Sequence, residues 1–196
     1  MRKIRSVCVY CASSSRVAPA YFEAAQELGQ LLARKHIRCV YGAGGQGLMG
    51  TLADAVMQEG GEIIGVIPQF MYDNGWNHPT LKNLEITPDI HSRKQRMAAL
   101  SDAVIALPGG CGTFEELLEI ITWKQLGLYL NPIIILNTDG YYDPLIEMLD
   151  RATDEHFMRP EHRAMWCAAK TPQEAIDALY SAPEWDENYV NSPLYR

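Results

Sequence analysis

The chain has 196 residues with a formal net charge of -7 at pH 7, and 47% of its residues are hydrophobic while 21% are charged. This length and balance are typical of one globular domain. The acidic charge argues against a main role in binding nucleic acid or anionic membranes, because both favour basic surfaces, but it leaves room for a local basic pocket that binds one phosphate.

The N-terminal apolar run over 7–10 is too short for the core of a signal peptide, and no stretch approaches the roughly 18 apolar residues that span a bilayer. We therefore expect a cytoplasmic protein without a membrane segment. The five cysteines are an odd number, which does not suit a disulfide framework. Cys8 and Cys11 form a CxxC that begins inside an expected strand, so we expect structural cysteines. We expect His156 and His162 at the surface, and no metal or cofactor.

Short apolar segments alternate with amphipathic segments along the whole chain. In chain order, the patterns predict strands over 7–10, 38–41, 62–67, 84–87, 103–107, 132–136 and 165–168, and helices over 19–35, 52–59, 92–100, 113–127, 142–156 and 171–180. Residues 71–84 are expected to be irregular because Asn74-Gly75 and Pro79 break regular structure. Short buried strands between helices predict an α/β fold with a Rossmann-like, doubly wound parallel sheet in three αβα layers.

The connections are short, so we expect one nucleotide-binding domain over 1–180, followed by a C-terminal tail over 181–196 that is polar and contains proline. The tail is expected either to be loose or to pack on a partner subunit.

A first glycine-rich loop, 42–50, lies between an expected strand and an expected helix and has the GxGxxG spacing. Glycines let backbone N–H groups approach an anion at the start of a helix. We expect Gly44 and Gly45 to contact a phosphorylated ligand, and the alternative is a tight turn that serves packing alone. A dinucleotide site needs an acidic residue at the end of the next strand, and 66–69 has none, which favours a mononucleotide or sugar phosphate over NAD.

A second loop, Pro108–Thr113, also follows a buried strand and precedes a helix. Two such loops in one open sheet indicate a shared crevice at the carboxyl ends of the strands. Thr113 suits a helix N-cap, and the loop can offer N–H and hydroxyl donors to a phosphate. Glu116 has two interpretations: a capping box with Thr113, or a functional carboxylate; Glu115 is either a solvated first-turn acid or a ribose contact.

Three cations lie within four residues of an expected helix, at Arg93, Lys94 and Arg96. A solvated basic face is the ordinary explanation of such a run. Because this run directly precedes the strand that leads to the second loop, an arginine facing the crevice is an alternative. The planar guanidinium suits a phosphate or carboxylate partner.

Taken together, these motifs resemble those of the LONELY GUY (LOG) family, whose members are cytokinin riboside 5'-monophosphate phosphoribohydrolases long mislabelled as lysine decarboxylases. The matching segments are 108–116 (PGGxGTxxE), 42–50 (the GGGxxGLMG loop), 91–94 (HSRK), 122–127 (TWKQLG) and 140–143 (GYYD). The resemblance implies a hydrolase that cleaves the N-glycosidic bond of a nucleoside 5'-monophosphate, such as a cytokinin nucleotide or AMP, to free base and ribose 5-phosphate.

The resemblance also implies the roles of individual residues and the assembly. Arg93 and Glu116 would be the catalytic pair. The protein would form a homodimer or a higher homo-oligomer, with the active site near the subunit interface. Family members often carry a glutamate about eighteen residues before the arginine, which this chain lacks. The substrate contacts implied by the matching motifs are Gly44, Gly45, Lys94, Gly109, Gly110, Cys111, Gly112, Thr113, Glu115 and Thr122.

Two alternatives remain open at the level of sequence. A decarboxylase that uses pyridoxal phosphate needs a Schiff-base lysine, and Lys94 and Lys124 are the central candidates. The second alternative is a nucleotide-binding or carrier module without catalysis. The paired carboxylates at the second loop argue against this alternative.

Overall fold

A computed structural model describes residues 2–186 of the chain, so most of the expected tail, 187–196, lies outside the described residues. Within that range, seven parallel strands form one sheet in the order β4-β3-β2-β1-β5-β6-β7. The strands are β1 (Ser6–Tyr10), β2 (Arg38–Tyr41), β3 (Ile63–Pro68), β4 (Leu84–Thr87), β5 (Val104–Ala106), β6 (Ile133–Leu136) and β7 (Cys167–Ala169). The predicted α/β fold with a doubly wound parallel sheet is confirmed.

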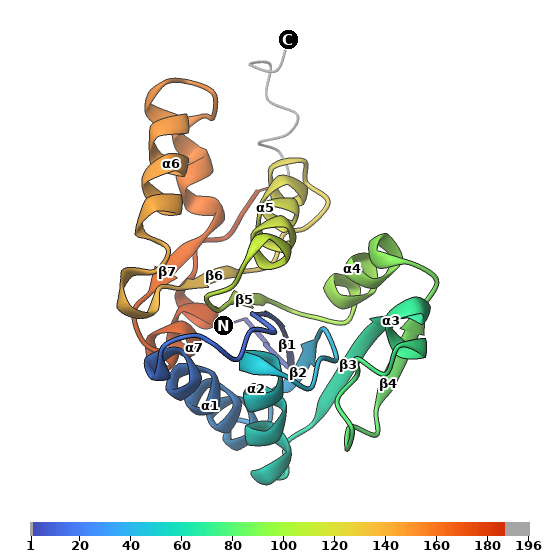
Figure 1. The fold of residues 1–196 in the computed structure, drawn as a ribbon. Coiled ribbons are helices and arrows are strands. Elements are labelled where there is room, and N and C mark those ends of the chain that lie inside the picture. Colours follow the sequence, from blue (N-terminus) through green and yellow to red (C-terminus); the bar gives the residue numbers. More distant parts are fainter. Residues whose placement is uncertain (1, 187–196) are drawn as a thin grey trace.

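Helices cover both faces of this sheet (Figure 1). Helices α1 (Pro19–Arg34), α2 (Gly47–Gln58) and α7 (Pro172–Ser181) lie on one face, and α4 (Ile90–Ala99), α5 (Cys111–Gln125) and α6 (Asp143–Asp154) lie on the other. A short helix, α3 (Gln69–Asp73), follows β3, and 3-10 segments span Thr138–Gly140 and Pro160–Met165.

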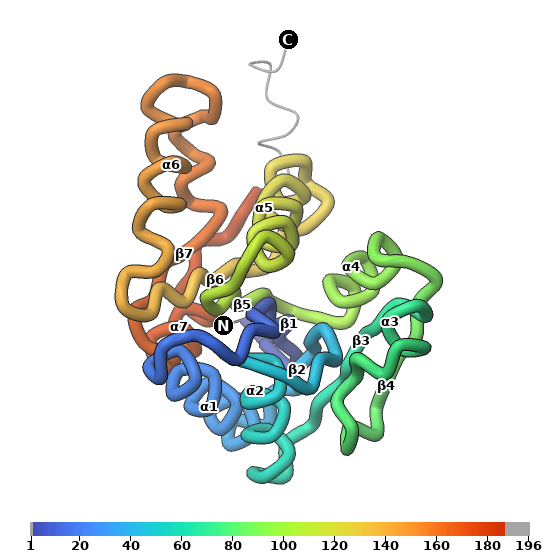
Figure 2. The backbone as a smooth tube through the Cα atoms, viewed as in Figure 1, coloured from blue at the N-terminus to red at the C-terminus, as the bar shows by residue number. Residues whose placement is uncertain are grey.

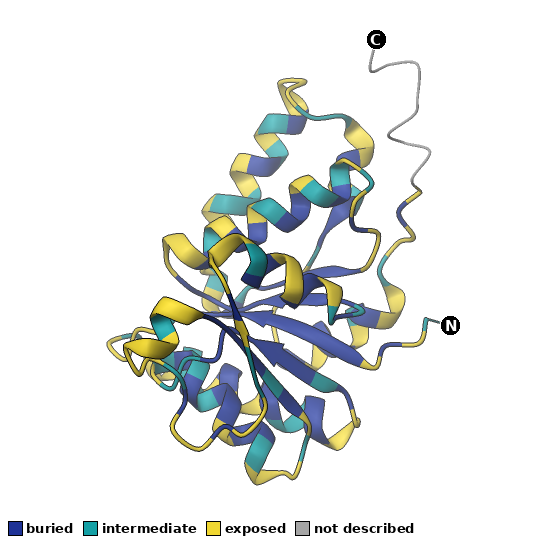
Figure 3. Ribbon diagram, turned by 90° about the vertical axis from the view of Figure 1, so that its right-hand side faces the viewer, coloured by how far each residue is buried: buried dark blue, intermediate teal, exposed yellow. Residues whose placement is uncertain are grey.

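The two hydrophobic cores follow from the alternation of side chains along the strands. Val9 of β1 packs in the core with Leu28 of α1, whereas its neighbour Tyr10 packs in the opposite core with Met97 of α4 and Leu117 of α5. The central strands are therefore buried on both faces, as their dark blue colour in Figure 3 shows. This explains why their sequences are continuous apolar runs.

The chain reverses its direction of travel across the sheet next to β1, as the tube in Figure 2 shows. It moves outward from β1 through β2 and β3 to β4, and α4 then carries it back to β5 on the other side of β1. In open α/β sheets, ligands bind at such a reversal, outside the carboxyl ends of the strands. The fold thus directs attention to the loops that follow β1, β2 and β5.

Several helix boundaries differ from those predicted, and one difference matters for the site. Helix α5 begins at Cys111 with Gly110 in extended conformation at its N-cap, so the prediction that Thr113 caps the helix is wrong. Helix α2 begins at Gly47, inside the glycine loop, and the end of α3 covers the first residues of the segment expected to be irregular.

The expectation that His162 lies at the surface is also wrong. The 3-10 segment turns its side chain inward, where it is 3% exposed and its Nδ1 accepts a hydrogen bond from the backbone N–H of Arg159. All five cysteines are free thiols, and Cys8, Cys11 and Cys39 are buried. In the described part of the chain, no helix is long and apolar enough to cross a membrane.

Candidate active site

A cavity of about 270 Å³ lies at the carboxyl ends of the strands, where the chain reverses. The loops after β1 and β5 are tied together there, since the backbone N–H of Ala12 donates to the carbonyl of Pro108 at 3.3 Å. Residues from four parts of the chain line this cavity: Cys11, Ala12, Ser13, Ser14, Met49, Arg93, Gly110, Gly112, Thr113 and Glu116. We call it the reaction cavity.

One wall of the reaction cavity is the start of α5. Because the N-cap Gly110 makes no side-chain capping bond, the N–H groups of the first turn remain available to an anion. A Cβ atom at Gly109 would overlap the hydroxyl of Thr113, so glycine is needed there for the loop to fold back on the helix. The loop is braced from behind by Tyr141, whose hydroxyl donates to the Gly109 carbonyl at 2.6 Å. This wall can hold a phosphate.

The start of α2, which is also rich in glycine, is covered by another part of the chain. Gly47 has a φ of +58°, and a Cβ there would overlap the backbone of Ser13 and Ser14. The loop after β1 therefore lies directly over this helix start. The α5 start contributes Gly110, Gly112 and Thr113 to the lining of the reaction cavity, whereas the α2 start contributes Met49.

At the floor of the cavity, Arg93 of α4 and Glu116 of α5 form an ion pair. The guanidinium Nη2 lies 3.2 Å from Glu116 Oε1, and the two side chains are 9% and 7% exposed. Arg93 Nε also donates to the carbonyl of Val66 on β3 at 3.2 Å, which fixes the plane of the guanidinium. A capping box does not account for Glu116, because the helix begins five residues before it.

Burial raises the pKa of Glu116 above its ordinary range, and Glu115 acts in the same direction, whereas the positive charge of Arg93 opposes the shift. Burial outweighs the ion pair because a carboxylate removed from water loses more solvation energy than one neighbouring cation restores. A carboxylate with a raised pKa is a better proton acceptor, which suits a general base.

Three of the other expected contacts, Lys94, Glu115 and Thr122, do not line the reaction cavity. Lys94 is 3% exposed, and its ammonium pairs with Glu115 and, at 3.0 Å, with Glu119. These pairs join α4 to α5, and the charges of Lys94 and Glu115 are near enough to act on the pKa of Glu116. Thr122 lies farther along α5, and its hydroxyl donates to the carbonyl of Leu118.

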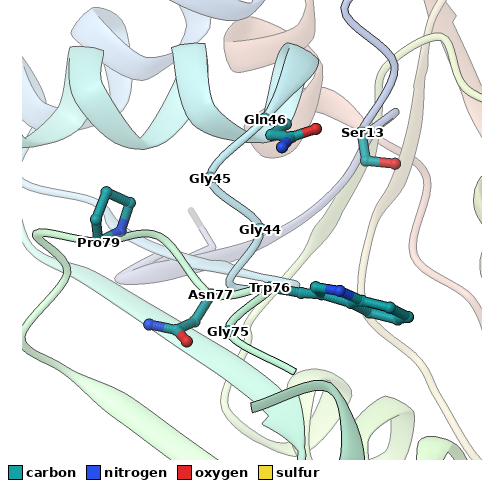
Figure 4. Close-up of a pocket in the computed structure, with 8 residues that line it drawn as sticks. All are labelled: Ser13, Gly44, Gly45, Gln46, Gly75, Trp76, Asn77 and Pro79. Carbon is teal, nitrogen blue, oxygen red and sulfur yellow. The ribbon is translucent and has the colours of Figure 1, made fainter. Parts of the chain in front are cut away.

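A second cavity of about 600 Å³ adjoins the reaction cavity, and Ser13 lines both. Figure 4 shows the residues that surround it: Ser13, Gly44, Gly45, Gln46, Gly75, Trp76, Asn77 and Pro79. Gly44 and Gly45 thus face this cavity. No periodic pattern marks Trp76 in the sequence, because it lies in the irregular segment after α3. Gly75 stands where the glutamate of family members was expected, and its φ of +68° favours glycine.

The strand order, with its reversal beside β1, is that of the Rossmann-like class of α/β domains, and glycine-rich helix starts at the crevice are typical of its nucleotide-binding members. Residues 49–179 match the family model described as "Possible lysine decarboxylase", and the chain belongs to this family. Its similarity to curated LOG proteins also confirms the predicted resemblance.

Two plant relatives illustrate that similarity. Over 189 residues the chain is 46% identical to the "Probable cytokinin riboside 5'-monophosphate phosphoribohydrolase LOGL2" of Oryza sativa subsp. japonica, which covers 96% of this chain and 78% of the relative. It is 43% identical over 186 residues to the "Cytokinin riboside 5'-monophosphate phosphoribohydrolase LOG7" of Arabidopsis thaliana, which covers 94% of this chain and 86% of the relative.

Solved structures share the fold at lower identity. The molybdenum cofactor binding protein from Rippkaea orientalis superposes with a TM-score of 0.69 at 23% identity, covering 92% of this chain and 98% of that one. The Moco carrier protein from Chlamydomonas reinhardtii gives a TM-score of 0.68 at 20% identity, with the same coverage. At these identities the likeness concerns the fold alone.

Proposed function

We propose that this protein is a phosphoribohydrolase that cleaves the N-glycosidic bond of nucleoside 5'-monophosphates, such as a cytokinin riboside 5'-monophosphate or AMP, and releases the free base and ribose 5-phosphate. The buried pair of Arg93 and Glu116, in one cavity with an open helix start, carries the proposal. The activity named for relatives that are 43–46% identical over nearly the whole chain supports it.

In this proposal the 5'-phosphate lies at the start of α5, against Gly110, Gly112 and Thr113. Binding there is remote from the bond that breaks, so its energy serves to position C1' of the ribose next to Glu116. Ser13 and Ser14, which also line the cavity, offer further polar groups.

During cleavage the bond between C1' and the base nitrogen lengthens, and the ribose acquires the character of an oxocarbenium cation. The Glu116 carboxylate stabilises this positive charge and accepts a proton from the attacking water. The water oxygen then bonds to C1', and the departing base nitrogen takes up one proton, so hydrolysis is balanced. Arg93 holds the carboxylate in place and faces the side on which the base departs.

The test is incubation of the purified protein with AMP, followed by chromatography for free adenine and an assay for ribose 5-phosphate. Equal amounts of both products are expected. A non-catalytic carrier would bind AMP and release neither product, which would refute the proposal.

A pyridoxal phosphate decarboxylase finds little support in the site. The ammonium of Lys94 is paired with two carboxylates, and the Nζ of Lys124 donates to the Asn131 carbonyl at 2.9 Å. Neither lysine lines the reaction cavity.

We further propose that the protein acts in the cytoplasm as a homodimer or higher homo-oligomer. Free buried thiols suit a reducing compartment. Large apolar side chains exposed on α5 and just beyond it, at Leu118, Leu126 and Leu128, suit a subunit contact. Light scattering on the purified protein measures the mass of the assembly. The mass of a single chain would refute the proposed homo-oligomer.

A further inference from the structure

The second cavity contains an exposed aromatic ring that the catalytic proposal does not use. Trp76 is 57% exposed, and its indole is supported edge-on by Phe70, with ring centroids 6.4 Å apart and planes 79° apart. In Figure 4 the indole extends toward the side of the cavity on which Ser13 lies, whereas the Asn77 side chain points the other way. A large apolar ring therefore lies open at a cavity wall next to the reaction cavity.

Main-chain hydrogen bonds fix the segment that carries this ring. The N–H of His78 donates to the Ala43 carbonyl at 2.7 Å, and Asn77 forms an antiparallel bridge with Gly44. The N–H of Trp76 donates back to the Met71 carbonyl at 3.1 Å. The backbone that carries the indole is thus fixed relative to the first glycine loop, so little ordering of the main chain is needed when a ligand binds.

The chemistry of the second cavity fits a neutral planar ligand. Among the described residues, those that line it carry no charged side chain, and its polar side chains are Ser13, Gln46 and Asn77. A phosphate would find no cation there. A nucleobase is neutral, its flat face stacks on an aromatic ring, and its edge accepts and donates hydrogen bonds to amides and hydroxyls.

The direction from the reaction cavity to this one also fits a base. The guanidinium of Arg93 lies against Gly42, at the end of β2 and two residues before Gly44. A nucleotide with its phosphate at the start of α5 and its C1' at Glu116 therefore extends past Arg93 toward Gly44 and Trp76. We infer that Trp76 is a specificity-determining residue that stacks on the base of the nucleotide, which rests on the proposed function for the identity of the ligand.

Replacement of Trp76 tests the inference by separating the base from the ribose phosphate. In Trp76→Ala we expect the KM for AMP to rise roughly ten- to a hundredfold, since base–aromatic stacking commonly has this effect, with little change in kcat. Trp76→Phe should restore most of the affinity. The inhibition constant of ribose 5-phosphate, which has no base, should be the same in all three proteins.

Tyr72→Ala provides a matched control, because Tyr72 is an exposed aromatic residue of the same segment that lines neither the reaction cavity nor the second cavity. It should keep the wild-type KM. A wild-type KM for AMP in Trp76→Ala would overturn the inference, and so would an equal loss of affinity for AMP and ribose 5-phosphate, which would indicate a general change of the site.

A binding measurement keeps this inference separate from the proposed reaction. In Glu116→Gln, AMP should quench tryptophan fluorescence while ribose 5-phosphate should not, and Trp76→Phe in the same background should abolish the change. If the wild type quenches with AMP but releases no adenine, the proposed reaction fails and base stacking stands. If adenine is released without quenching at Trp76, the inference fails and the reaction stands.

Discussion

Arg93 Nη2 lies 3.2 Å from Glu116 Oε1, although the two residues belong to different helices on one face of the sheet. Helix α4 packs on β3 and β4 and α5 contacts β1, so the two helices approach each other beside the point where the sheet reverses. The sheet reversal therefore brings together a cation and a carboxylate that the chain separates by 23 positions.

Glu116→Gln should reduce adenine release by at least about a thousandfold, because the amide keeps the shape of the side chain but neither stabilises a cation nor accepts a proton from water. AMP binding should persist. The thermal midpoint at neutral pH should be no lower than that of the wild type, since the raised pKa means that ionised Glu116 costs stability in the folded protein. Calorimetry and an adenine assay measure both effects.

Glu85→Gln is the control for that variant. Glu85 also pairs with an arginine of α4, Arg96, but this pair is exposed and lies outside the reaction cavity. The Glu85→Gln variant should release adenine at the wild-type rate. Adenine release by Glu116→Gln at the wild-type rate would refute the assignment of the carboxylate.

The rate should fall on the acidic side at a pH above the ordinary glutamate pKa of 4.5. Ionised Glu116 is the active form, and its pKa is raised by burial, so protonation sets in at higher pH than for an exposed glutamate. A profile of kcat/KM against pH reports this value for the free enzyme. An acidic limb at or below 4.5 would contradict the raised pKa.

Gly42→Ala tests the position of Arg93. The new Cβ would overlap the tip of the Arg93 side chain, so the guanidinium would have to move. Its displacement from Glu116 should lower kcat about ten- to a hundredfold, and it should also cost stability because it separates a buried ion pair.

The contrasting variant is Gly61→Ala, whose Cβ would overlap Ala33 and the Val56 side chain, away from the reaction cavity. It should lose stability, with kcat unchanged for the folded protein. Denaturant unfolding measures the stability of both variants, and steady-state kinetics measures their kcat. If Gly42→Ala has wild-type kcat, the position of Arg93 is not important for the reaction.

Lys124→Met should stabilise the protein at pH 7 by roughly 1–3 kcal/mol. Lys124 is 1% exposed, and burial lowers its pKa from 10.5 to about 8, with Arg2 acting in the same direction. Between these two pH values the unfolded chain binds more protons than the folded protein, so wild-type stability should gain a contribution as the pH rises from about 8 to 10.5.

In Lys124→Met this contribution should vanish. Chemical unfolding at pH 7 and pH 10 measures it, with Lys170→Met, at an exposed lysine, as the control. Equal pH dependence in the wild type and Lys124→Met would show that the ammonium is not desolvated.

The fold and the meeting of the two glycine-rich loops could be predicted because strand and helix periodicities are local, and the carboxyl ends of parallel strands share one edge. The residue at which α5 begins could not be predicted. Thr113 has the side chain of a good N-cap, yet the N-cap is Gly110, three residues earlier, where the backbone is extended. Whether Glu116 belongs to a capping box depends on where the helix begins, so the sequence left that choice open.

The sequence also did not show which side chains point into the site. Glu115 and Glu116 are neighbours in the chain, but successive helical residues point about 100° apart, so one side chain is 56% exposed and the other is buried. Lys94 of α4 pairs with Glu115 and Glu119 of α5, a link between helices that the sequence did not indicate, and its contact with substrate stays a prediction. Trp76 has no periodic neighbours, so no sequence pattern distinguished it from an ordinary loop residue.

The attachment of the Trp76 segment to the first glycine loop has a consequence for how such proteins diversify. The bonds at Ala43–His78 and Gly44–Asn77 use main-chain atoms, so side chains at 76 and 77 can be exchanged without loosening the segment. If Trp76 stacks on the base as inferred, mutation there alters which base is accepted while Arg93 and Glu116 stay unchanged. Substrate selectivity could then evolve independently of the residues proposed to cleave the bond.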